Sequence, residues 1–335
     1  MATGTPFSPT PFATSVVAAS ATSVTRRIPY ISPSEYRFAP TAVATTDLVP
    51  GSTQQAVDSL NSLAQVINRA SSWIDTYCFH TGDGTLAASP STEQGWIVPR
   101  SNGSLGIIAN YKPILEVLGV AVGPTPSSLV SLDSSVSPDI WIENKIIWIP
   151  SSWPFAGQPS FPTFFSPVAN GGVYAVWSYV NGYPHTYLQA DATLGASTLV
   201  VGPSSPDGTA VSGIYPNTQL TIHDGANTEV VVVSSVGSFS SGGVTLNLVS
   251  PLQYAHTVPA SPDTIRVSAL PWAVEQACIS ITSCLIKTRG SRGMVMPTSP
   301  GQVPNQRALA QAGALEDFTA ATDLLKPFVT TFLAR

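Results

Sequence analysis

The sequence predicts an α+β protein: a helical domain with a small β-sheet, an inserted all-β module of sandwich or barrel-like type, and an extended N-terminal arm. Three observations lead to this prediction. Apolar residues recur at helical spacing over residues 53–78 and 270–289. A strand pattern over 173–183 contains Asn181-Gly182, a pair typical of a turn. Between that turn and the second helix, residues 188–268 contain short β-branched runs separated by turn residues, which predicts a module inserted at a short link.

These patterns divide the chain into three parts. We expect an extended arm over residues 1–50, a helical domain formed by 51–187 and 269–335, and the β module over 188–268. The length of 335 residues suits two domains plus tails. Because the host strand and helix on either side of the module need only a short link, we expect the module to fold independently.

Charged residues are scarce. They make up 10% of the chain, against about 25% in a typical domain, while hydrophobic residues make up 43%. This balance favours a protein whose surface is largely buried against other chains. The net charge of −5 argues against a general nucleic-acid-binding surface.

Residues 1–50 are rich in Pro, Thr, Ser and Ala, and their prolines exclude a long helix. The segment cannot build its own core, so it is either disordered or an arm that lies on a neighbouring molecule. Its regularly spaced aromatic residues favour the arm, and we expect it to be ordered only after assembly. No signal peptide and no membrane span are expected.

The helix over 270–289 carries charge at Glu275, Lys287 and Arg289 alone, so most of its circumference could be buried. A domain of this size is not expected to cover every side of a helix. We therefore expect its outer face, including Ser283, to contact a neighbouring copy. A last helix is predicted over 308–326, before Pro327.

Residues 150–172 interleave prolines with aromatic residues, and a loop of this length is uncommon unless it has a function. It is either a proline-stiffened strap over the core or an aromatic surface that docks on another subunit. Arg289 and Arg292 flank Gly290 and fit either a solvated helix end or a local contact to nucleic acid. The candidate subunit or partner interface comprises Trp153, Phe155, Phe161, Phe164, Phe165, Arg289 and Arg292.

The sequence contains none of the phosphate-loop, dinucleotide, zinc-protease or Cys-x-x-Cys motifs, and we predict no catalytic, cofactor-binding or metal-binding residues. Cys78 and His80 could place two ligands on one side of a strand, but a metal site needs more. The three cysteines are predicted to be reduced and buried.

Several carboxylates are candidates for catalytic groups. Glu93, Glu116 and Glu143 could pair for glycoside hydrolysis, but structural roles explain them better. His223-Asp224, close to Glu229 in sequence, is better explained by a hairpin turn at Asp224-Gly225.

Four motifs, taken in order, resemble the head–tail connector (adaptor) proteins of long-tailed bacteriophages. The first is Pro113-Ile-Leu-Glu-Val-Leu-Gly-Val120, the second is Ile146-Ile-Trp-Ile-Pro150, the third is Tyr179-Val-Asn-Gly-Tyr183 and the last is Leu324-Leu-Lys-Pro-Phe328. They follow an N-terminal amphipathic helix and enclose a helix that begins at Leu270-Pro271. The long arm and the β insert depart from the family's pattern.

The resemblance implies a structural virion protein and not an enzyme, located in the neck between capsid and tail and assembled in the host cytoplasm. It implies a homo-oligomeric, dodecameric ring that contacts the portal protein and tail, tail-terminator or stopper proteins, with DNA passing through its channel and with no cofactor or membrane. Two alternatives stay open: a minor tail or capsid decoration protein, and a carbohydrate-binding or carbohydrate-active protein that uses the insert.

Overall fold

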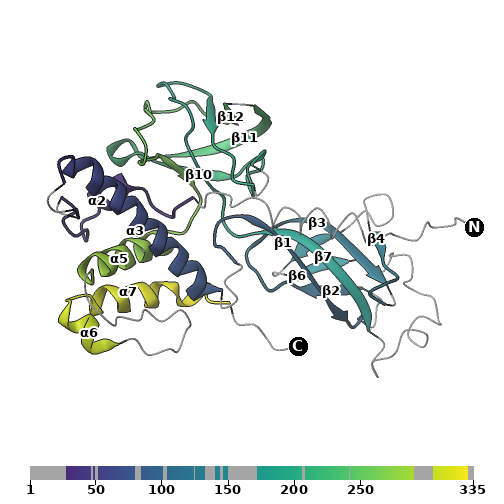
Figure 1. Cartoon of the computed structure of the whole chain (residues 1–335). Helices are drawn as coiled ribbons and strands as arrows, with labels where there is room; N and C mark the ends of the chain where they lie inside the picture. The colour runs from purple at the N-terminus through teal and green to yellow at the C-terminus, as the bar shows by residue number, and fades with distance from the viewer. Residues whose placement is uncertain are drawn as a thin grey trace, which may run out of the picture. The chain divides into compact units, whose positions relative to one another are not determined.

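The computed structural model describes residues 28–46, 48–49, 52–79, 84–100, 104–123, 125–132, 140–143, 146–149, 172–205, 208–240, 242–289 and 305–330 (Figure 1). They form helices and three antiparallel sheets, which confirms the α+β class. Contacts separate them into two compact units. The all-β unit spans Ala88–Gly182, and the mixed unit combines Val24–Ala87 with Tyr183–Arg335.

This division differs from the domains expected above. Residues 88–182, which we assigned to the helical domain, form a unit of their own, whereas residues 188–268 share a compact unit with the helices. The physical reason for the second difference is a buried ion-pair cluster in which Arg266 of the expected insert contacts Glu35 and Glu275. Hydrophobic periodicity predicts local structure and does not reveal which elements share a core.

Helices of the mixed unit pack side by side, with α5 between α3 and α7 (Figure 1). Their bounds are α2 Pro33–Phe38, α3 Gln55–Cys78, α5 Trp272–Lys287, α6 Gln306–Gln311 and α7 Leu315–Leu325, with 3-10 turns at Gly225–Asn227 and Lys326–Phe328. The last predicted helix is therefore two helices. Gly313, with a φ of 64°, lies between them in a conformation that favours glycine.

The Ser283 side of helix α5 is buried within its own chain. Ser283 is 1% exposed, and its hydroxyl lies 2.9 Å from the Tyr36 hydroxyl and 3.4 Å from the carbonyl oxygen of Thr41. The expectation that the Ser283 side of this helix contacts a neighbouring copy is therefore wrong. That side is covered by α2 and by the segment that follows it.

Part of the expected arm is folded. The Ser32 hydroxyl accepts a hydrogen bond from the Glu35 backbone N–H, and the Glu35 carboxylate accepts one from the Ser32 N–H, which together form a capping box at the start of α2. Tyr30 and Ile31 are buried beside it. Residues 28–46 thus belong to the mixed unit, and residues 1–27 lie outside the described part.

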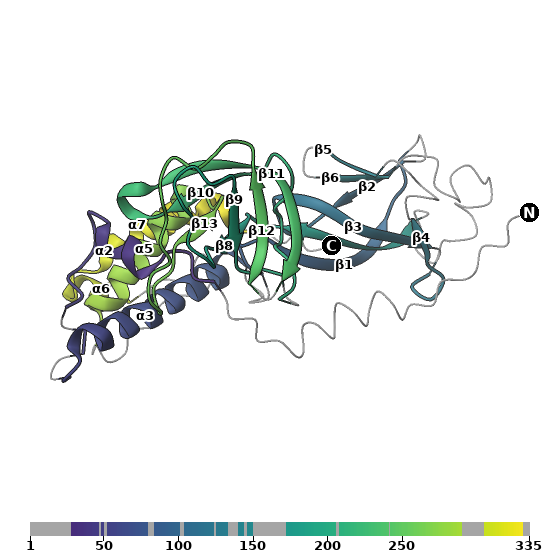
Figure 2. The ribbon, with the colours of Figure 1, turned by 90° about the horizontal axis from the view of Figure 1, so that it is seen from above.

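The sheet of the mixed unit has the strand order β8-β13-β10-β11-β12-β9. The bounds are β8 His185–Tyr187, β9 Thr198–Val201, β10 Gln219–His223, β11 Glu229–Ser240, β12 Gly243–Leu248 and β13 Arg266–Ser268. An isolated antiparallel bridge joins Leu188, which follows β8, to Val201 at the end of β9, and Figure 2 shows the strands of this sheet from above. Its inner face supplies a core of aliphatic residues that includes Leu220, Val233 and Val267.

Two sheets of the all-β unit share one core. The first sheet has the strand order β1-β7-β3-β4, and its strands are β1 Ser89–Ile97, β3 Ile114–Gly123, β4 Val130–Leu132 and β7 Val173–Asn181. The second sheet has the strand order β2-β6-β5, and its strands are β2 Leu105–Ile108, β5 Trp141–Glu143 and β6 Ile146–Ile149. Ile107 and Ile147 of the second sheet and Val122 and Trp177 of the first belong to this core. The strand predicted over 173–183 is confirmed as β7, which ends two residues earlier.

Candidate functional site

The predicted interface is described only at Arg289. Trp153, Phe155, Phe161, Phe164, Phe165 and Arg292 lie outside the described residues. Arg289 is exposed just beyond the end of α5, and its backbone N–H donates to the Ile286 carbonyl at 3.3 Å. A cation is favoured there by the partial negative charge of the helix C-terminus.

An exposed aromatic surface lies on the three-stranded sheet of the all-β unit. Strand pairing places Trp141, Trp148 and Gly106 in one row across β5, β6 and β2. The two indole rings stack with centroids 6.4 Å apart and an interplanar angle of 21°, and the Arg100 guanidinium lies 4.1 Å from the centre of the Trp148 ring. A Cβ at position 106 would lie 3.0 Å from the Trp148 ring, so glycine leaves room for the indole.

A second row on the same face contains Ile108, Ile146 and Glu143. The Glu143 carboxylate accepts a hydrogen bond from the Trp141 ring N–H at 3.3 Å. We call the outer surface formed by Arg100, Ile108, Trp141, Ile146 and Trp148 the tryptophan face. Trp141 is 42% exposed and Ile108 is 46% exposed. Large apolar side chains gathered on one face of a sheet mark an interaction surface.

A second constellation, the Glu35 cluster, joins four elements of the mixed unit. It consists of Glu35 from α2, His223 from β10, Arg266 from β13 and Glu275 from α5. Arg266 is wholly buried and binds both oxygens of Glu35, with an Nε–Oε2 distance of 2.5 Å; its Nη2 also donates to Glu275 Oε1 at 3.1 Å. The two His223 ring nitrogens lie 3.2 Å from Glu35 Oε1 and 3.3 Å from Glu275 Oε1.

The cluster shifts the pKa of each member. Burial would raise the pKa of Glu35, but Arg266 outweighs burial and holds it below its usual value. Burial raises the pKa of Glu275, an effect that Arg266 offsets only in part. Burial, followed by the charge of Arg266, lowers the pKa of His223 to about 4. The four residues come from distant segments, and no motif in the sequence links them.

His185 lies beside this cluster and is also buried. Its Nδ1 lies 3.0 Å from the Ser268 hydroxyl, and its Nε2 lies 3.0 Å from the Pro29 carbonyl oxygen. Burial and the charge of Arg266 lower the pKa of His185 to about 3. The ring is therefore neutral at pH 7 and donates one hydrogen bond to a backbone carbonyl.

His256 is held inside the β module. Its two ring nitrogens lie 2.8 Å from Asp224 Oδ2 and 2.8 Å from Glu229 Oε1. The backbone N–H groups of Gln253 and Tyr254 also donate to Glu229. Asp224 and Glu229 thus bind His256 and not His223, which precedes Asp224 in the sequence. No nucleophilic side chain completes this group among the described residues, and it ties strands and turns together.

Two of the other candidate carboxylates, Glu93 and Glu143, accept hydrogen bonds within their own sheets or turns. Glu93 accepts a hydrogen bond from the Tyr179 hydroxyl and from the Asn110 backbone N–H at 3.0 Å, and Glu143 accepts one from Trp141. Glu116 lies exposed on β3. Cys78, Cys278 and Cys284 are buried and form no disulfide, as predicted, and His80 lies outside the described residues. Burial raises the pKa of Cys278 to about 12 and favours an unreactive thiol.

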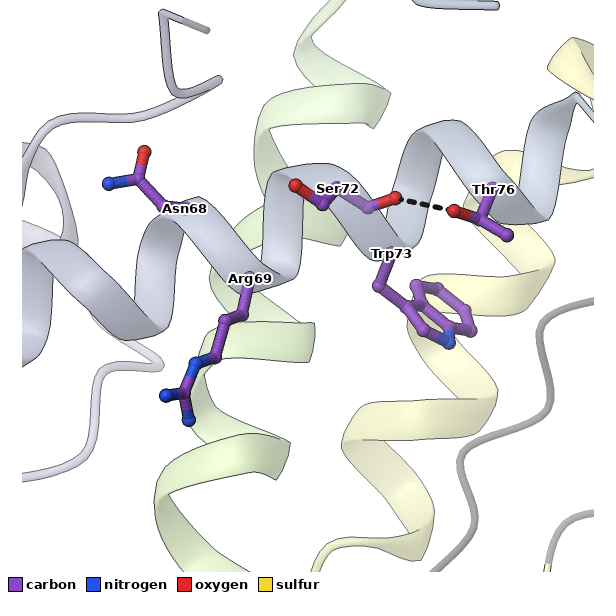
Figure 3. Close-up of a pocket in the computed structure, with 5 residues that line it drawn as sticks. All are labelled: Asn68, Arg69, Ser72, Trp73 and Thr76. Atoms are coloured by element: carbon purple, nitrogen blue, oxygen red, sulfur yellow. Dashed lines mark hydrogen bonds between the residues drawn. The ribbon is translucent and has the colours of Figure 1, made fainter. Parts of the chain in front are cut away.

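A hollow on α3 is lined by Asn68, Arg69, Ser72, Trp73 and Thr76 (Figure 3). The Thr76 hydroxyl donates to the Ser72 carbonyl at 2.9 Å, and Trp73 points toward α7, where its ring meets Phe318 edge-on at 5.7 Å. All five residues come from one helix. The hollow is therefore a surface feature of helix packing, without the converging polar groups of a ligand site.

The described residues contain no group of three or more His, Cys, Asp or Glu side chains placed to hold a metal ion. No helix in the described ranges is sufficiently long and apolar to cross a membrane. No family model, curated protein or solved structure matches this chain.

Proposed function

We propose that this chain is a structural virion protein that assembles into a ring in the neck of a long-tailed bacteriophage, between the portal protein and the tail. The observation that carries this proposal is the tryptophan face. Its stacked indoles and flanking isoleucines are held rigidly by strand pairing, yet Trp141 and Ile108 expose nearly half of their surface. Burial of the exposed part of Trp141 against a neighbouring copy would contribute about 2–3 kcal/mol to the free energy of association at each interface.

The order of elements supports the same proposal. Helix α3 is followed by β3 with its Pro113-Ile114 motif, by β7 leading into the Tyr-x-x-Gly-Tyr segment, and by α5. Helix α7 then precedes the closing Leu-Leu-Lys-Pro-Phe segment. This is the order that the resemblance to head–tail connectors implies. The low charged fraction of 10% suits a protein with much of its surface in subunit contacts.

In this proposal each copy presents the tryptophan face to a different surface of the next copy. A head-to-tail contact of this kind closes into a ring when its rotation fits. A dodecameric ring then contacts the portal protein on one side and a tail terminator or stopper on the other, with DNA in the channel. The part of the arm before residue 28 and the 150–172 segment are proposed to add contacts between copies.

Native mass spectrometry and negative-stain images of the purified chain test the proposal. We expect closed rings with a central hole. The variant Trp141→Glu should release monomers and keep its unfolding midpoint, because an unpaired charge is costly only where the face is covered. Ser127→Glu, which adds the same charge to an exposed position of the same unit, should leave the rings intact.

Three outcomes would count against the ring. If the chain stays monomeric at high micromolar concentration, it does not form a ring by itself. If the Trp141→Glu variant keeps its rings, the tryptophan face is not the contact between copies. Assemblies without a central hole would favour a tail or decoration protein. If oligosaccharides raise the melting temperature of a monomeric chain, and if this rise is lost in the Trp141→Ala variant, a carbohydrate-binding protein is favoured.

A further inference from the structure

The tryptophan face carries a row of aromatic surface that crosses all three strands of its sheet. Trp141 and Trp148 stack with ring centroids 6.4 Å apart, and the Trp148 ring lies against Gly106, where a Cβ would be 3.0 Å from it. Neighbouring strands lie about 4.8 Å apart, so the row is about 10 Å long from β5 to β2. Beside it, Ile146 and Ile108 form a second, apolar row.

The polar groups of the face narrow the chemistry of its occupant. The Arg100 guanidinium lies 4.1 Å from the centre of the Trp148 ring, and a guanidinium has N–H donors but no acceptor. The Glu143 carboxylate already accepts the Trp141 ring N–H at 3.3 Å. The face therefore suits an uncharged occupant that brings apolar rings and carbonyl oxygens. A polyproline II segment has these properties, because its backbone makes no internal hydrogen bonds, and such segments bind aromatic-lined surfaces.

The chain contains such a segment near its N-terminus. The sequence Pro6-Phe-Ser-Pro-Thr-Pro-Phe12 includes a Pro-x-x-Pro motif, and residues 2–25 contain no charged side chain. Proline fixes φ near −65°, which favours polyproline II. In that conformation Pro6 and Pro9 lie on the same side of the segment, about 9 Å apart. This spacing matches the length of the aromatic row.

We propose that residues 6–12 of one copy bind the tryptophan face of a neighbouring copy. The inference rests on the proposed function in placing this face between two copies, and it names the part of the next copy that covers the face. Residues 1–27 lead to Ile28, the first described residue. Residues 13–27 alone span about 50 Å when extended, which is long enough to reach another copy.

A second Pro-x-x-Pro sequence, Pro159-Ser-Phe-Pro162, is the weaker candidate. It belongs to the 150–172 segment, which lies outside the described residues and joins β6, ending at Ile149, to β7, beginning at Val173. Both of its ends are thus tied to strands of the same unit. The N-terminal segment is joined to the described residues only through Ile28 and has the longer reach.

Cross-linking between two full chains tests the proposal. One chain carries Thr10→Cys and the other carries Ile108→Cys, while the native cysteines are buried. The two are mixed at low protein concentration, concentrated together and oxidised mildly. Disulfide-linked pairs should form about tenfold faster than with Ser127→Cys, at an exposed position of the same unit, because a bound arm holds its thiol near the face at an effective concentration in the millimolar range.

Two changes should remove the excess of linked pairs. One replaces Pro6, Pro9 and Pro11 by alanine in the chain that carries Thr10→Cys, and the other adds a synthetic peptide of residues 3–15 as a competitor. Linked pairs no more abundant than with Ser127→Cys would overturn the inference. A link that forms only when both cysteines are in one chain would also overturn it, because the arm would then bind its own copy.

The result is separable from the ring. Rings without the cross-link would leave the proposed function standing and overturn this inference, whereas the cross-link in assemblies without a central hole would support the inference and count against the ring.

A second measurement needs no engineered cysteine. In the full chain at low protein concentration, the peptide of residues 3–15 should shift the indole N–H resonance of Trp141, and the same peptide with alanine in place of its prolines should not. A Trp141 resonance that stays in place up to about 1 mM peptide, or that moves only with a peptide of residues 157–165, would overturn the proposal.

Discussion

Arg266 and Glu35 form a bidentate ion pair although 231 positions separate them in the chain. The arginine lies on β13 and is wholly buried, and the glutamate belongs to the capping box of α2. One side chain thus starts a helix and also fixes that helix to the sheet. The pair explains why the β module shares a compact unit with the helices.

Replacing Arg266 by leucine should destabilise the mixed unit by about 3 kcal/mol, because the partly buried carboxylates of Glu35 and Glu275 then lose their cation. Urea unfolding followed by circular dichroism measures the change. Arg37→Leu removes an exposed arginine from the same region and should cost less than about 0.5 kcal/mol. Equal losses in the two variants would show that the buried pair does not stabilise the fold.

The variant Ser283→Glu should unfold the monomer. Ser283 is covered by Tyr36 and Thr41, so a carboxylate there would be buried without a cation, at a cost of several kcal/mol. Gln276→Glu, at a partly exposed position of α5, serves as the control and should fold. Thermal unfolding of both variants at low protein concentration, where the chain is monomeric, measures whether each one folds. A folded Ser283→Glu monomer would place this side of α5 at the surface.

Loss of the α2 capping box should be measurable. Ser32→Ala removes the acceptor for the Glu35 backbone N–H and should cost about 1 kcal/mol. Ser72→Ala, at an exposed position within α3, should be neutral or slightly stabilising, because alanine has the higher helix propensity. Denaturant midpoints of the two variants give the comparison, and a cost at Ser72 as large as at Ser32 would contradict it.

Acid should destabilise the protein through His185. The folded pKa is lowered from 6.5 to about 3, so the neutral ring contributes stability that is complete above pH 6.5 and is lost as the pH falls toward 3. The slope contributed by this one group reaches about 1.4 kcal/mol per pH unit. His185→Asn cannot titrate and should show a shallower dependence between pH 6.5 and 4. The same slope in both proteins would exclude His185 as a cause.

Much of the local structure was predictable from the sequence. The helix over 55–78 follows from apolar residues at a spacing of three and four, and β10 and β12 follow from β-branched runs between turns. The pairing of β5 with β6 could also be predicted, because two short runs of alternating side chains flank Asn144-Lys145. These features depend on neighbours in sequence, for which backbone geometry sets the periods of 3.6 and 2 residues.

Tertiary structure alone decided which of these elements share a core. Glu35, His223, Arg266 and Glu275 come from four elements, and each is an ordinary polar residue in its own segment. The tryptophan face likewise needed the register of three strands to bring Trp148 between Trp141 and Gly106. Side-chain periodicity assigns a residue to a face of its own helix or strand. Which faces meet depends on burial and charge pairing summed over the whole fold, and these contacts decided that α2, α5 and the β module form one unit.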